Sequence, residues 1–481
     1  MRRMRYALIG LGAAALMPTG VLASGTVPVS HDPSPYINCS PPAAGGTNYP
    51  NAEVEPYVAN NPHTSGNLIA VWQQDRWSNG GAHGLAAGYS IDDGTSWTQV
   101  TLPFDACAPG GLPFERASDP WISIGPDGTA YADALSFNLG ANFNNGISAA
   151  TSTDGGKTWG NTQLIELDKT MTGTELNDKN SITADPVHAG TAYAIWDDVS
   201  SPFAGFFNRH VLGFQGDAIL SKTTDGGRSW SGTKIIVHTG NFTQTIGNVI
   251  VIDPRTGTLY DFFDLILGTN SVGKNHGKPP TGPSPFNVAF VKSTDGGSSW
   301  TNPQIIANEQ TVGVPNTRTG DILPEPAIDP ATGQLYVVWQ DSRFNGFNYD
   351  EVAISTSTNG GGTWSTPARV NDNTGQPAFT PMVVVNSAGK VGVTYYQFLS
   401  QSPSSLPTDV FDKTSSNQGG SFGAASLITG PFDMTTAPQA GGFFLGDYEG
   451  LVNNGTEFHP VFVVTNTGNL TNRTDVVASE F

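Results

Sequence analysis

Short apolar runs separated by Gly, Pro and Asn dominate the hydrophobic pattern of this chain. The runs occur in pairs, with a turn rich in Pro or Gly between the two members of a pair, which is typical of antiparallel β-strands rather than of helices. The expected strand pairs are residues 57–59 with 68–72, 121–124 with 130–134, 181–184 with 192–196, 249–252 with 259–263, 327–328 with 335–339, and 382–385 with 391–396. The pattern therefore predicts an all-β protein built from four-stranded antiparallel units.

One motif recurs after these strand pairs, at intervals of roughly 60 to 70 residues. A well-formed copy reads Ser-Thr-Asp-Gly-Gly-Lys-Thr-Trp from Ser152 to Trp159. The copies begin at Ser90, Ser152, Thr223, Ser293, Ser357 and Ser415. An Asp or Asn oxygen can accept N–H groups of the following turn, Gly supplies a positive φ, and the Trp can pack beneath the sheet. We interpret the motif as a strand–turn–strand corner that supports the scaffold and takes no part in the chemistry.

This motif resembles the Asp-box (BNR repeat) of the sialidase-like β-propeller superfamily. The resemblance implies that each box joins the third and fourth strands of a blade, on the face opposite the active site. A last repeat begins near Gly446, pairs with residues 461–465 and ends at 476–479 without a box. We therefore predict a single seven-bladed propeller; a six-bladed ring with a C-terminal appendage is the alternative.

The N-terminus predicts export and closure of the last blade. Basic residues followed by a short apolar run and small residues indicate a signal peptide over residues 1–23. Residues 24–50 form a segment in which 26–30 can complete the last blade, and 51–481 form the propeller. In an oxidising compartment Cys39 and Cys107 can form a disulfide. We predict a secreted, extracellular monomer.

The charge balance excludes two classes of partner. The formal net charge is −19, with 13% charged residues. Nucleic acid and anionic membranes both require a basic face, so we expect neither as a partner.

One position per blade is expected at the mouth of the central channel, on the face away from the boxes. Aligning the blades on their first turn places there Glu55, Asp119, Lys179, Gly247, Leu323, Thr380 and Asp447, with Asp178, Asp321 and Glu449 nearby. Glu55, Asp119 and Asp447 can hold a cation such as Ca²⁺, which prefers oxygen ligands. The alternatives are acid–base groups with separated pKa values, or solvated charges lining a water-filled channel.

Arginines and aromatic residues are expected on the same face. The candidates for binding an acidic sugar are Arg76, Arg116, Arg318, Arg343 and Lys179, because Arg captures carboxylates in a bidentate manner. Trp77, Phe137 and Phe344 are candidates for stacking on sugar rings.

The sialidase resemblance implies a Tyr nucleophile paired with a Glu, and an Asp acid. Tyr448 matches the nucleophile best, Glu449 follows it but points the other way in a strand, and Asp75 or Asp119 is the candidate acid. The sequence lacks the Phe/Tyr-Arg-Ile-Pro segment with which that family typically opens.

A second resemblance is to secreted rhamnose–glucuronate lyases on Asp-box propellers, which implies a central metal. In that reading His83 is the acid–base group, because histidine side chains as a type can take up and release a proton near neutral pH, and Arg76, Arg116 and the cation neutralise the uronate. The sequence thus predicts an enzyme that cleaves a terminal bond in an acidic glycan. Sialidase-like hydrolysis, uronate elimination and non-catalytic binding of a glycan or protein all remain open.

Overall fold

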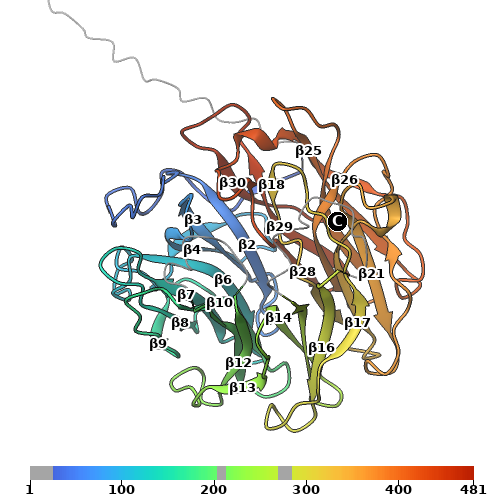
Figure 1. Cartoon of the computed structure of the whole chain (residues 1–481), viewed down its shortest axis with the longest axis horizontal. Coiled ribbons are helices and arrows are strands. Elements are labelled where there is room, and N and C mark those ends of the chain that lie inside the picture. The colour runs from blue at the N-terminus through green and yellow to red at the C-terminus, as the bar shows by residue number, and fades with distance from the viewer. Residues whose placement is uncertain (1–24, 203–212, 269–283) are drawn as a thin grey trace, which may run out of the picture.

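The computed structural model describes residues 25–202, 213–268 and 284–481, and in these residues the regular structure consists of β-strands and short 3-10 turns. The predicted leader at 1–23 lies outside the described residues, as do residues 203–212 and 269–283. Figure 1 shows the sheets arranged around a common centre. The all-β prediction is confirmed.

The chain runs through successive four-stranded antiparallel meanders. One sheet contains β2 (Glu53–Asn60), β3 (Leu68–Arg76), β4 (Ala82–Ser90), β5 (Thr98–Thr101), β6 (Arg116–Ile124), β7 (Ala130–Phe137), β8 (Asn145–Ser152) and β9 (Gly160–Leu164). A second contains β10 (Glu175–Ala184), β11 (Ala192–Ser200), β12 (Gln215–Thr223), β13 (Lys234–Val237), β14 (Thr243–Asp253), β15 (Thr258–Leu267), β16 (Asn287–Ser293) and β17 (Gln304–Asn308). In each sheet a short pairing, β4 with β6 or β12 with β14, links two meanders.

Three four-stranded sheets and one two-stranded sheet make up the rest of the β-structure. The first two are β19 (Glu325–Ile328), β20 (Leu335–Asp341), β21 (Glu351–Ser357), β22 (Ala368–Arg369), and β23 (Ala378–Val385), β24 (Val391–Phe398), β25 (Pro407–Ser415), β26 (Ser426–Asp433). The last holds β28 (Gly450–Asn454), β29 (Glu457–Thr465), β30 (Thr474–Ala478) and the N-terminal β1 (Val27–Pro28). The expected strand pairs lie within these strands. The count of seven blades and the closure of the ring stay predictions.

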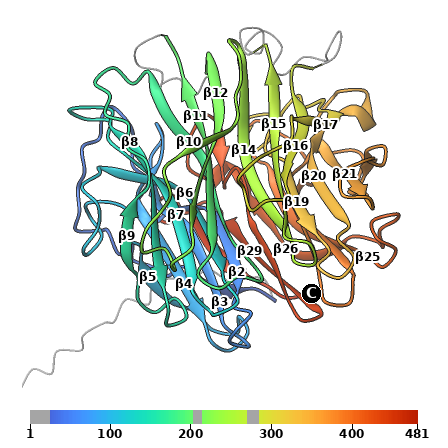
Figure 2. The ribbon, with the colours of Figure 1, turned by 90° about the horizontal axis from the view of Figure 1, so that it is seen from below.

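Large apolar side chains fill the space between neighbouring sheets. Trp72, Trp196 and Trp339 occupy equivalent places on the second strands β3, β11 and β20, and all three are fully buried. Burying an aromatic of this size stabilises the fold by about 3 kcal/mol or more. Figure 2 shows the same sheets from a direction at a right angle to that of Figure 1.

The repeated motif forms the corner expected of it. In the first copy the Ser90 hydroxyl donates to Asp92 Oδ1 (2.8 Å), Gly94 N–H donates to Ser90 Oγ (2.9 Å), and Ser96 N–H donates to Asp92 Oδ1 (2.9 Å). Gly94 has φ 81°, where a side chain would be strained. Strand register places the corner away from the start of β2, because Leu68 pairs with both Ser90 and Asn60, at the far end of β2.

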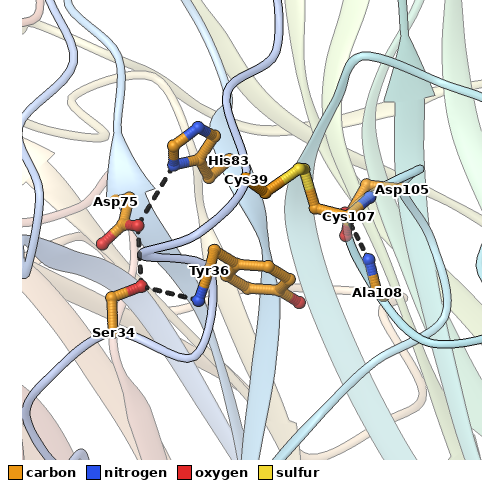
Figure 3. The surroundings of a disulfide bond; sticks show 8 residues. All are labelled: Ser34, Tyr36, Cys39, Asp75, His83, Asp105, Cys107 and Ala108. Atoms are coloured by element: carbon orange, nitrogen blue, oxygen red, sulfur yellow. Dashed lines mark hydrogen bonds and ion pairs between the residues drawn. A yellow bond between two sulfur atoms is a disulfide. The ribbon is translucent and has the colours of Figure 1, made fainter.

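The segment before β2 is attached to the body at several points. β1 pairs with β30, and the Ser34 hydroxyl donates to Asp75 Oδ2 (2.7 Å). A disulfide joins Cys39 to Cys107 in the loop after β5 (Figure 3). The expected disulfide is therefore present, and it spans 68 residues of sequence.

Removal of this disulfide should destabilise the protein measurably. For a loop of this length, loop-closure entropy predicts that Cys39→Ser combined with Cys107→Ser lowers the free energy of unfolding by about 4 kcal/mol. Urea unfolding of wild type and variant measures the difference. Reductant should lower the free energy of unfolding of the wild type to that of the variant and should not change that of the variant. Equal free energies of unfolding for the two proteins without reductant would contradict the expectation.

Candidate functional site

The innermost strands carry a β-bulge at the position expected to face the centre. Register shifts occur in β2, β6, β10, β14 and β23 at this place. The residues at the bulges have positive φ: Glu55 53°, Asp119 50°, Lys179 46°, Gly247 72° and Thr380 48°. A left-handed conformation costs a residue other than Gly about 1 kcal/mol or more, and such strain clusters at functional sites. The bulges are thus equivalent features that direct selected side chains toward one point.

The Lys179 ammonium lies at that point. Its Nζ is 2.7 Å from Asp447 Oδ2, 3.2 Å from Asp119 Oδ1 and 3.5 Å from Glu55 Oε1. The Lys179 side chain is only 12% exposed. Three carboxyl groups, two from strands of one sheet (β2 and β6) and one from the loop before β28, therefore share one cation. We call Glu55, Asp119, Lys179 and Asp447 together the ring.

Arg318 adds a second cation on the other side of Asp447. It lies in β18 (Thr317–Arg318), which pairs in parallel with β27 (Phe443–Phe444). Its Nε donates to Asp447 Oδ1 (3.0 Å), its second terminal nitrogen donates to Asp447 Oδ2, and its guanidinium lies 4.5 Å from the Phe444 ring centre. Burial alone would raise the pKa of Asp447, but Arg318 and Lys179 outweigh burial and hold that pKa well below its usual range. Asp447 therefore stays ionised at any working pH.

A cavity of about 740 Å³ opens beside this cluster, and five charged residues line it: Asp178, Lys179, Arg318, Asp321 and Asp447. Its remaining wall is largely apolar and includes Leu176, Val199, Ile246, Ile322, Leu323 and Phe347. A smaller cavity of about 100 Å³ adjoins it, lined also by Arg76, Asp119 and Phe137, and shares Asp178, Lys179 and Arg318 with it. The size and the mixed lining are typical of a small-molecule or glycan site.

Asp178 differs from Asp447 in its protonation. It is half-buried, and its Oδ1 accepts the Lys179 backbone N–H (3.0 Å). Burial, together with the nearby Asp119 carboxylate, raises its pKa to about 6, although Lys179 opposes the rise. Two carboxyl groups with pKa values pushed apart therefore line one cavity, which is the arrangement that general acid catalysis uses.

Glu55 lies deeper in the cluster. It is almost fully buried, accepts a hydrogen bond from Gln73 Nε2, and accepts the Asp447 backbone N–H at Oε1 (3.2 Å). Burial raises its pKa to about 7, against the opposing effect of Lys179. Glu55 lines neither cavity, and it therefore contacts the other ring residues from the interior of the protein.

His83 and Asp75 form a pair outside the two cavities. His83 Nδ1 lies 3.1 Å from Asp75 Oδ2, beside the disulfide and Tyr36 (Figure 3). Asp75 also accepts the Ser34 hydroxyl and the Asn51 N–H (2.8 Å), so it ties the N-terminal segment to the end of β3. Neither side chain lines the cavities. The structure does not bring these two predicted catalytic residues together with the ring.

Tyr448 and Glu449 point to different places. The Tyr448 hydroxyl donates to the Pro120 carbonyl (3.3 Å), and its ring packs 5.0 Å from that of Trp121, below the Lys179 ammonium. Glu449 is fully buried and accepts the Thr394 hydroxyl (2.8 Å). The two side chains do not form a nucleophile–base pair in this structure.

The predicted arginines fall into two groups. Arg76 and Arg318 lie at the cavities, and burial lowers the pKa of Arg76 to about 10. Arg116 is fully buried, donates to the carbonyls of Gly80 and Ala43 (2.8 and 2.9 Å), and stacks on Trp77. Arg343 pairs with Asp341 away from both cavities. Arg116, Arg343 and Trp77 are therefore engaged in intramolecular contacts, whereas Lys179, Arg76 and Arg318 face the candidate site.

The expected calcium ligands converge, but on an ammonium. Glu55, Asp119 and Asp447 surround Lys179 Nζ, and within the described ranges no group of three or more His, Cys, Asp or Glu side chains is placed to hold a metal ion. Ca²⁺ requires six to eight oxygen ligands around free space. The residues as arranged do not fit that ion, and the calcium prediction has no further support.

The sequence does not predict one lining residue, Phe347, and it predicts the place of a second, Asp178, without its role. Phe347 lines the large cavity from a loop, with φ 65°, next to Asn348. A left-handed Phe is an unusual backbone state that neither alternation nor the repeat predicts. Asp178 was expected near the ring, but not as the carboxyl group that lines both cavities.

Comparisons with known proteins agree with the Asp-box resemblance. No family model matches the chain. A stretch of 109 residues, 22% of the chain, is 29% identical to a sialidase of Micromonospora viridifaciens, and the match spans 15% of the length of that protein. Over that stretch the chain is similar in sequence to a sialidase, as the boxes predict, and the match covers only a small part of that enzyme.

Solved structures of similar shape include two carbohydrate-active enzymes. The Hadza microbial sialidase Hz136 is 14% identical with a TM-score of 0.47, over 87% of this chain and 74% of that one. An α-L-arabinanase of Penicillium chrysogenum is 13% identical with a TM-score of 0.46, over 96% and 99% of the two chains. At TM-scores below 0.5 these likenesses carry no argument about the reaction.

Within the described residues, no helix has the length and apolar character needed to cross a bilayer.

Proposed function

We propose that this sialidase-like chain is a carbohydrate-active enzyme that hydrolyses a terminal glycosidic bond in the large central cavity. One observation carries the proposal: Asp178, whose pKa is raised to about 6, and Asp447, whose pKa is lowered, line the same cavity. Glycosidases commonly use one carboxylic acid and one carboxylate on the two sides of the bond that breaks.

In this proposal Asp178 protonates the leaving oxygen. As the bond breaks, positive charge develops on the sugar, and the ionised Asp447 carboxylate stabilises that charge. A water molecule then adds to the anomeric carbon and gives one proton to the Asp178 carboxylate, which restores the acid. Lys179 and Arg318 hold Asp447 in position through contacts of 2.7 and 3.0 Å. The apolar wall around Leu176, Ile246 and Phe347 restricts water to the polar floor.

We further propose an acidic glycan as the substrate and export as the setting. Arg76, Lys179 and Arg318 supply positive charge at the two cavities, which favours a sugar carboxylate. Export rests on the N-terminal leader pattern and is consistent with the disulfide. The proposed exported form is a monomer.

A substrate panel tests this proposal. We expect the protein expressed without residues 1–23 to release fluorophore from at least one terminal glycoside in a panel holding a sialoside, a glucuronide and a neutral arabinofuranoside. Absorbance near 235 nm, followed with a rhamnose-capped glucuronate polymer, reports elimination instead. Fluorophore release that vanishes in Asp178→Asn supports hydrolysis. A signal for an unsaturated uronate favours the lyase alternative, and glycan binding without turnover by either assay favours the binding alternative; both would overturn the proposal.

A further inference from the structure

The ring of Glu55, Asp119, Lys179 and Asp447 has the geometry of a cation site in which the cation is a lysine side chain of the protein itself. Carboxylates of Glu55, Asp119 and Asp447 come from the bulge of β2, the bulge of β6 and the loop before β28. Their oxygens lie 2.7 to 3.5 Å from one point, and the Lys179 Nζ occupies that point. Lys179 adopts a left-handed backbone (φ 46°), as Glu55 and Asp119 do. The bulge directs the Lys179 side chain inward, and its four methylene groups are long enough to place the ammonium at the centre.

The charges around this point require a cation. Buried carboxylates that lose a partner are strongly destabilising, and Asp447 is held ionised by Arg318 and Lys179. Arg318 contacts only Asp447 among the three carboxylates in hydrogen bonds. Asp119 and Glu55 depend on Lys179 for their close cationic contact. Without the ammonium, three carboxylates would face one another across the space it leaves.

We propose that Lys179 is a built-in counter-ion that stands where a divalent cation would otherwise bind, so that the native ring is metal-independent and loss of the lysine converts it into a divalent-cation site. Oxygen ligands from three elements would then surround the vacated space, and Ca²⁺ accepts such ligands in flexible geometry. The inference concerns the charge balance of the ring and does not depend on which glycan is cleaved.

Calcium titration of Lys179→Ala tests the proposal. We expect the variant to have a Tm several degrees below that of the wild type in EDTA, and to recover most of that loss in millimolar CaCl₂, since a ligand that binds only the folded state stabilises it. Isothermal calorimetry should show Ca²⁺ binding at least tenfold tighter than to the wild type. The wild-type Tm should be the same in EDTA and in CaCl₂.

Lys413→Ala is the matched control. Lys413 is also buried and also pairs with a carboxylate, that of Asp372, but it donates in addition to the Val370 carbonyl (2.8 Å) and has one carboxylate rather than three. Its loss should lower the Tm with no recovery in CaCl₂. Recovery in Lys413→Ala would mean that calcium acts elsewhere and would overturn the assignment.

Two further results would overturn the proposal. One is a Lys179→Ala protein that gains no Ca²⁺ affinity. The other is a wild-type Tm that rises in CaCl₂ and loses this rise in Asp119→Asn, which would place a metal ion in the native ring. If Lys179→Ala folds only in the presence of CaCl₂, the proposal stands; if it folds in neither condition, calcium does not replace the ammonium and the proposal fails.

Discussion

Asp447→Asn should abolish turnover and cause a large loss of stability. The substitution removes the charge that Lys179 and Arg318 share, and both cations then remain in a largely buried site. Breaking a buried ion pair in this way costs about 3–5 kcal/mol. Turnover should fall by roughly 10³-fold or more, because the carboxylate proposed to stabilise the developing charge is gone. Urea unfolding and kcat on the substrate found in the panel measure the two effects.

Asp372→Asn is the control for the stability effect. Asp372 also pairs with a lysine, but the Asp372 side chain is 53% exposed, so water can replace part of its contact and the loss of stability should be smaller than that of Asp447→Asn. An Asp447→Asn protein as stable as this control would show that the ring does not depend on Asp447.

Asp178→Asn should separate catalysis from stability. The amide cannot donate a proton to the leaving oxygen, so turnover should fall by about 10²–10⁴-fold. Stability at neutral pH should not fall, because burial already disfavours the charged form of Asp178 and the amide carries no charge. Measurements of kcat/KM and of urea unfolding on the same preparation test both statements.

The pH dependence provides a second readout for Asp178. Folding raises its pKa from 3.8 to about 6, so the folded state binds the proton more tightly than the unfolded state. This group therefore contributes stability that is fully present below pH 3.8 and is lost as the pH rises to about 6. The decline in unfolding free energy over that range should be weaker in Asp178→Asn; an unchanged slope together with unchanged turnover would remove Asp178 from the site.

The strands and the corners follow from local patterns, which explains why they could be predicted. Alternation of apolar and polar residues and the repeated Ser-x-Asp-x-Gly spacing act over a few residues, and the bonds around Asp92 involve only its near neighbours. Alignment of the repeats likewise predicts which residues reach the centre. Glu55, Asp119, Lys179 and Asp447 do meet there.

The roles of these residues depend on longer-range geometry, which the pattern does not contain. The position of the Lys179 ammonium among the three carboxyl groups depends on the length and direction of its side chain. His83 is a plausible acid–base residue by type, but its position beside Asp75 depends on the N-terminal segment folding back near the Cys39–Cys107 disulfide. The left-handed Phe347 reaches the cavity through a loop conformation that no periodicity encodes.

The pairing of β1 with β30 has a consequence for how the chain is assembled. Residues near 27 leave the ribosome well before their partners near 478. The strand β1 therefore lacks this partner until residues near 478 have been made, and contacts between residues so distant in sequence slow folding. Any fusion placed directly before β1 would therefore lie next to this late pairing and should slow maturation of the protein.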